Sequence, residues 1–170
     1  MEKQVFFEEY PCWIVLLANA VSLAVYALGA FLMFRLGVLW LLAYLLCVIV
    51  LEARVLKKSC VNCCYYGKTC AFGKGRLAAL FFSRGNPKSF AKRQVSWKDV
   101  APDFLIFVIP VAVGAWFLIQ AFDWVLLGAI VLLLLLGFAG NAFVRGSLAC
   151  KHCAQRRIGC PAEKMFSKKK

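Results

Sequence analysis

The sequence predicts an all-α integral membrane protein with four transmembrane helices arranged as two tandem hairpins. Hydrophobic residues fill 63% of the 170 positions and the mean hydropathy is +0.76, which is too apolar for a soluble domain of this length. These residues form four long apolar runs, and a helix of about 20 apolar residues crosses a bilayer core. A cysteine pattern, C-x2-C-x6-C, follows each pair of runs, which indicates an internal repeat.

The first repeat is expected to cover about residues 10–75, with helices over 13–34 and 38–55. Its first apolar run follows an acidic leader and lacks a small-residue cleavage site, so we expect a span here and not a signal peptide. Arg35 to Gly37 provides the turn of the hairpin. The repeat ends with a cysteine triplet, Cys60, Cys63 and Cys70.

A basic loop over residues 76–102 is expected to separate the repeats. Residues 72–75, Phe-Gly-Lys-Gly, read as a flexible basic link. The apolar run 76–82 is too short to span a membrane, and we expect it to lie in the headgroup layer. Residues 89–98 are a second candidate surface helix.

The second repeat is expected over about residues 103–165, with helices 104–122 and 124–144 and the triplet Cys150, Cys153 and Cys160. A shift of about ninety residues places one repeat on the other. Because each repeat has an even number of spans, the repeats share one orientation, and the axis relating them runs along the membrane normal. Both triplets should therefore meet at one face of a single membrane domain, 1–170.

The basic residues predict which face that is. Of the 21 Lys and Arg residues, 11 lie between Arg54 and Lys98 and eight lie from Arg145 onward. Loops rich in Lys and Arg stay on the cytoplasmic side of a membrane, so loop 52–103 and both termini are predicted to be cytoplasmic. Topology thus explains the charge without a nucleic-acid partner, and the expected partners are anionic lipid headgroups and a partner membrane subunit.

Nine cysteines on a protein whose loops face a reducing compartment favour metal or redox chemistry over structural disulfides. A C-x2-C pair turns both sulfurs toward one point, but three thiolates are one short of the four that Zn²⁺ prefers. Two triplets supply six thiolates, which can hold two Zn²⁺ ions if two sulfurs bridge. The predicted ligands are Cys60, Cys63, Cys70, Cys150, Cys153 and Cys160, with Cys64 as a further candidate.

The stretch from Cys150 to Pro161 resembles one half of the fungal Zn2Cys6 binuclear cluster, including its basic residues between the second and third cysteines. The resemblance implies that Cys60 and Cys150 are the bridging thiolates. The halves of that family are separated by a short loop, whereas 79 residues and two spans intervene here. DNA binding is therefore not carried over.

An iron–sulfur centre such as a [4Fe-4S] cluster is the main alternative to zinc, because Cys160-Pro161 resembles the Cys-Pro that closes many ferredoxin motifs. Redox-active dithiols and transient metal handling stay open as well. The chain has one histidine and no phosphate-binding motif, so a binding or scaffold module is favoured over an enzyme. The alternative function is a membrane redox protein.

Overall fold

The computed structural model describes residues 6–92 and 97–161. Within this part of the chain, four helices are long and apolar enough to cross a membrane. This confirms the all-helical class and the prediction of four helices that could cross a membrane. The spans are α1 (Cys12–Phe34), α2 (Val38–Lys58), α5 (Trp97–Gln120) and a fourth span made of α6 (Trp124–Leu135), the π-helical segment η2 (Leu136–Gly140), α7 (Asn141–Phe143) and the π-helical segment η3 (Val144–Cys150).

Short turns join the spans of each hairpin at one end of the bundle. Gly37 has φ of +122°, a conformation that L side chains rarely adopt, and it directly precedes α2. Asp123 caps α6, since its Oδ1 accepts a hydrogen bond from Val125 N at 2.9 Å. We call this end of the bundle the turn end.

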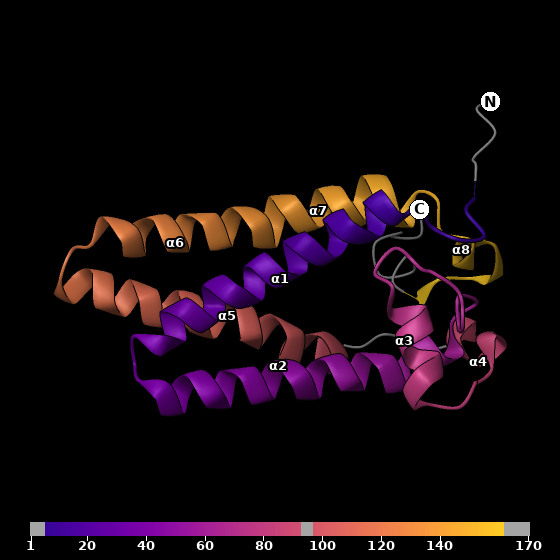
Figure 1. Cartoon of the computed structure of the whole chain (residues 1–170), viewed down its shortest axis with the longest axis horizontal. Coiled ribbons are helices and arrows are strands. Elements are labelled where there is room, and N and C mark those ends of the chain that lie inside the picture. The colour runs from indigo at the N-terminus through magenta and orange to yellow at the C-terminus, as the bar shows by residue number, and fades with distance from the viewer. Residues whose placement is uncertain (1–5, 93–96, 162–170) are drawn as a thin grey trace.

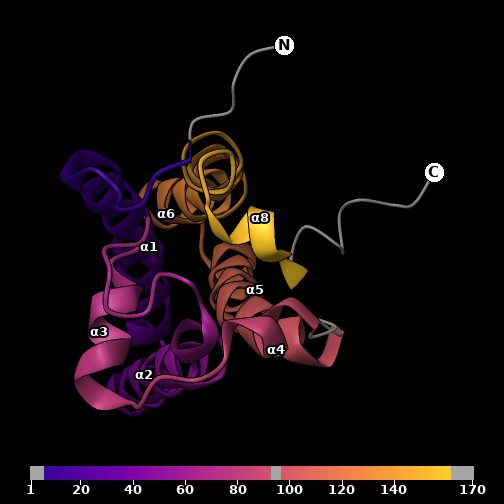
Figure 2. The ribbon, with the colours of Figure 1, turned by 90° about the vertical axis from the view of Figure 1, so that its right-hand side faces the viewer.

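The opposite end carries the cysteine triplets and the described short helices that lie outside the spans, and we call it the cysteine end (Figure 1). These helices are the 3-10 turn η1 (Cys60–Asn62), α3 (Lys74–Phe81), α4 (Pro87–Lys92) and α8 (Gln155–Ile158). Seen along the bundle, α3 lies at the side of α1 and α2, and α8 lies over α5 (Figure 2). Among residues 6–92 and 97–161, a cap of short elements therefore covers the cysteine end and not the turn end.

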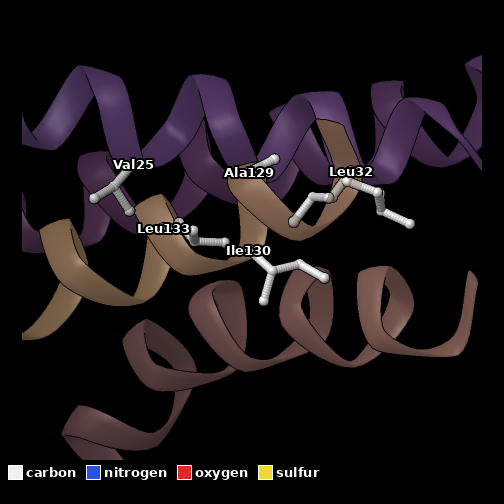
Figure 3. Packing of buried hydrophobic residues seen from close by; sticks show 6 residues of the cluster. Val25, Leu32, Ala129, Ile130 and Leu133 are labelled. Carbon is white, nitrogen blue, oxygen red and sulfur yellow. The ribbon is translucent and has the colours of Figure 1, made fainter. Parts of the chain in front are cut away.

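Helix α1 is the central element of the bundle. It runs obliquely from beside α7 at the cysteine end to beside α2 at the turn end (Figure 1). Its residues Val25 and Leu32 pack with side chains of α6 in the main apolar core (Figure 3). Phe107 of α5 also packs against this core. The α6 members of this core are Leu126, Ala129, Ile130 and Leu133.

Three helix boundaries differ from the sequence prediction by three residues or more. Helix α2 runs to Lys58 instead of 55, and the fourth span continues to Cys150 instead of 144. Helix α5 begins at Trp97, seven residues before the predicted start, and contains both Pro102 and Pro110. Asp99 in its first turn complements the helix dipole and pairs with Arg54 of α2 at 3.4 Å, which stabilises the early start. The predicted surface helix 89–98 overlaps α4 and the start of α5, and residues 93–96 lie outside the described part.

Candidate cysteine-rich site

The two cysteine triplets meet in a second apolar core at the cysteine end. Its buried residues include Tyr10 before α1, Tyr65 after the first C-x2-C pair, and Ala149 at the end of the fourth span. Four of the cysteines pack against this core: Cys63, Cys64, Cys70 and Cys153. Segments about ninety residues apart in sequence are thus neighbours in space.

The first C-x2-C pair forms a tight turn, or knuckle, in which the Cys63 sulfur lies beside the Cys64 thiol. The Cys64 thiol and the nearby backbone N–H groups of Tyr65 and Cys64 lower the pKa of Cys63, although burial opposes the shift. The pKa of Cys64 is raised by the same thiol contact and by burial. Donors aimed at one sulfur favour the thiolate, which is the form that binds metals.

The second C-x2-C pair has a similar knuckle. The backbone N–H of Gln155, two residues after Cys153, lowers the pKa of Cys153, as the N–H of Tyr65 lowers the pKa of Cys63. Burial, together with the neighbouring thiols Cys63, Cys160 and Cys150, nevertheless raises the pKa of Cys153 to about 11. The second knuckle is therefore the less favourable of the two for a thiolate without a cation nearby.

The knuckles also exchange hydrogen bonds. Gln155 Oε1 accepts a hydrogen bond from the backbone N–H of Cys64 at 2.9 Å and another from the Cys63 thiol at 3.7 Å. Reciprocally, Tyr65 Oη accepts from the backbone N–H of Ala154 at 3.0 Å. The residue two positions after each C-x2-C pair, Tyr65 or Gln155, thus forms a hydrogen bond with the backbone of the other knuckle.

The leader before α1 forms hydrogen bonds with both triplet regions. The N–H of Phe7 donates to His152 O and the N–H of Tyr10 donates to Thr69 O, both at 3.0 Å. Tyr10 Oη donates to Ala149 O, and Tyr65 Oη donates to Phe7 O. The leader therefore lies between the triplet regions and satisfies backbone groups of both.

An ion pair closes the base of the first triplet loop. Lys74 Nζ lies 2.6 Å from Glu52 Oε2, and Tyr26 Oη donates to Glu52 Oε1 at 2.7 Å. Glu52 precedes the first triplet and Lys74 follows it, so the pair draws α3 onto α1 and α2. Link 72–75 is accordingly packed, not flexible as the sequence suggested: a Cβ on Gly75 would stand 2.1 Å from the carbonyl oxygen of Tyr65.

The remaining predicted ligands are spread around this centre. Cys60 packs in an adjoining small core with Leu56, Val61 and Ala78, and has electrostatic interactions with Cys70 and Cys63. Cys160 is half-buried and Cys150 is exposed. Among residues 6–92 and 97–161, no group of three His, Cys, Asp or Glu side chains is arranged to hold a metal ion. The backbones of the knuckles are adjacent, but the six thiols do not form a ligand cage in this conformation.

Sequence reasoning missed Tyr10, Tyr65 and Gln155. The last two could have been found, because a shift of ninety residues that aligns Cys63 with Cys153 also aligns Tyr65 with Gln155. Tyr10 gives no such signal, since its partner Ala149 is contacted through a backbone carbonyl.

Comparison of the chain with protein-family models, with curated proteins and with solved structures finds no match in any of the three. The interpretation of the site therefore depends on its own residues and their chemistry.

Proposed function

We propose that the protein is a membrane-embedded binding module, without enzyme activity, whose two hairpins are clasped at the cytoplasmic face by a cysteine-ligated Zn²⁺ centre. The ligands are Cys60, Cys63 and Cys70 of one hairpin with Cys150, Cys153 and Cys160 of the other, and Cys64 is a further candidate. The same hairpin-plus-triplet unit occurs twice in this proposal.

The observation that carries the proposal is the contact between the knuckles. Cys64 N–H···Gln155 Oε1 and Ala154 N–H···Tyr65 Oη hold the two C-x2-C turns side by side. In each turn the backbone N–H two residues after the second cysteine lowers the pKa of its thiol, and hydrogen-bonding groups outside the ligand shell orient metal ligands. Gathering the sulfurs then requires rotation of cysteine side chains, and a metal ion would supply the energy for it, as at sites that form only with the metal.

Metal analysis of the full chain tests this proposal. Protein purified anaerobically in detergent is expected to contain zinc, and the double variant Cys63→Ser/Cys153→Ser is expected to lose it. Cys47→Ser is the matched control, because Cys47 lies within α2 and outside both triplets. Metal-free wild-type protein from zinc-supplemented cells would overturn the proposal. Iron with acid-labile sulfide would replace zinc by the iron–sulfur alternative and its redox function.

The partner that this module fits best is an anionic lipid surface, through α3. Leu80 and Phe81 of α3 are 77% and 69% exposed, although α3 lies outside the four spans. The helix lies across the long axis of the bundle in both views (Figures 1 and 2), which is the direction of the membrane plane. Arg76 and Arg84 flank the apolar residues, as in helices that lie in the headgroup layer.

Amide hydrogen exchange in lipid nanodiscs tests the role of α3. Exchange over residues 74–81 is expected to be slower in discs with anionic lipid than in zwitterionic discs, because acidic headgroups attract the flanking arginines. Arg76→Gln/Arg84→Gln should remove the difference, and Leu80→Asp should raise exchange in both discs. The amides around Asp123, at the turn end, are the internal reference. Equal exchange in all discs and variants would contradict this partner.

A further inference from the structure

The described leader, residues 6–11, crosses from one triplet region to the other. It is not helical, so its backbone groups find hydrogen-bond partners in the cap. Phe7 forms an isolated parallel β-bridge with Cys153 of the second triplet. The N–H of Tyr10 donates to Thr69 O, in the first triplet loop, at 3.0 Å. One short segment thus binds both hairpins through its main chain.

The aromatic side chains of the leader belong to the apolar core of the cysteine end. Tyr10 is 4% exposed, and its ring centroid lies 5.6 Å from that of Tyr65. The ring of Phe7 lies 5.4 Å from that of Tyr10 and 4.8 Å from that of His152. The thiols that pack against this core come from both triplets: Cys63, Cys64, Cys70 and Cys153. The leader therefore contributes side chains to the core that partly buries sulfurs of both hairpins.

The outward side of the leader is held by weaker contacts. Glu8 and Glu9 are exposed. Glu9 lies 3.9 Å from Arg76, in an ion pair whose side chains are 53% and 66% exposed, and such pairs contribute little to stability. A short non-helical segment held by a few hydrogen bonds and one buried side chain can undock while the helices beneath it stay folded.

We propose that the leader is a releasable strap that controls access to the thiols of both hairpins. While the leader is docked, dissolved ions and thiol reagents reach the four packed thiols slowly. When it undocks, all four become accessible in one event. The consequence for metal loading rests on the centre proposed above, because a docked leader then slows the entry of Zn²⁺. The gating of the thiols needs no metal.

Alkylation of the cysteines tests the strap in the full chain. The protein is reduced, freed of metal with a chelator and kept in detergent. Iodoacetamide is the probe, and mass spectrometry gives its rate of reaction at each cysteine in the folded and in the denatured protein. In the folded wild-type protein, the four packed thiols are expected to react more slowly than in the denatured protein.

Two substitutions each remove one hydrogen bond of the leader. Phe7→Pro removes the N–H that donates to His152 O, and Tyr10→Phe removes the hydroxyl that donates to Ala149 O. Each lost bond is expected to raise the reaction rate of the four thiols about 2- to 10-fold over wild type. The factor should be the same at both triplets, because a single undocking event exposes them together.

Matched controls separate the strap from general loosening of the cap. Glu8→Ala alters an exposed residue of the leader and should leave all four rates unchanged. Tyr66→Phe loses the hydrogen bond from Tyr66 Oη to Phe82 O at 2.7 Å, which lies outside the leader, and should leave the rate at Cys153 unchanged. Circular dichroism checks that each variant is folded, and Tyr10→Phe is the milder change if Phe7→Pro unfolds.

The outcomes separate this inference from the metal centre. Folded wild-type thiols that react as fast as denatured ones, unchanged rates in both leader variants, or a rise confined to one triplet would overturn the strap. Each of these results leaves the metal centre standing, because the measurement uses metal-free protein. Absence of metal from the purified protein would overturn the centre and leave the strap standing.

Discussion

The two ends of the bundle are closed by different means. At the turn end each hairpin reverses over a few residues, and one ion pair, Arg35–Asp123, joins the two turns, with side chains 42% and 36% exposed. At the cysteine end the leader, the first triplet and the second triplet meet around the buried side chains of Tyr10, Tyr65 and Gln155. The same four spans thus end in a simple connection on one side and a packed cap on the other.

This difference indicates which end of the bundle depends more on the identity of particular side chains. Hairpin turns require only a backbone reversal, which a glycine and a capping aspartate provide. The cap instead brings together backbone groups from distant parts of the chain and satisfies them with buried tyrosine and glutamine side chains. A buried polar group left without a partner costs more than an exposed one, so the cysteine end should tolerate less change than the turn end.

The largest expected effect comes from Gly75→Ala at the cysteine end. A Cβ at this position would stand 2.1 Å from Tyr65 O and 2.5 Å from Lys68 O, both backbone atoms that a side-chain rotation cannot move. We expect the free energy of unfolding in detergent to fall by about 3 kcal/mol or more, because the first triplet loop must move away from α3. Thermal unfolding followed by circular dichroism measures this change.

Gly128→Ala is its control in α6, the helix that starts at the turn end. No atom lies within 4 Å of a Cβ added there, and the backbone is helical. Alanine favours a helix over glycine by up to about 1 kcal/mol, so this variant should be as stable as wild type or slightly more so. Similar losses from both substitutions would show that the cap is not packed more tightly than the spans.

The bundle could be predicted from sequence because its signals are local. The apolar runs of α1 and α2 exceed the length of a bilayer crossing, and Gly37 and Asp123 separate the runs within each hairpin. The early start of α5 could not be predicted in the same way. It depends on the pairing of Asp99 with Arg54, residues 45 positions apart, and two prolines argue against it locally.

The sequence could predict which end of the bundle carries the candidate site, but not the hydrogen bonds and ion pairs that hold the site together. Identical cysteine spacing placed both triplets at one face, and the contact between their knuckles agrees with that placement. The contacts of Tyr10 and the pairing of Glu52 with Lys74 depend on tertiary structure. A sequence pattern gives residue types and spacing, but it does not tell which backbone carbonyl a buried hydroxyl will reach.

Two substitutions, each removing one positive charge at one end of the bundle, test the comparison with a smaller expected change in stability. Lys74→Met at the cysteine end leaves Glu52 with Tyr26 and no cation from α3, in a pair whose side chains are 25% and 30% exposed. Arg35→Met at the turn end breaks a pair that water already screens. We expect losses of about 1 to 3 kcal/mol for Lys74→Met and less than about 1 kcal/mol for Arg35→Met in the same thermal unfolding measurement. Adding Glu52→Gln to Lys74→Met should recover part of the first loss, because the carboxylate no longer needs a counter-charge. Equal losses of unfolding free energy for the two single variants would mean that the ion pair in the cap stabilises the fold no more than the exposed ion pair at the turn end.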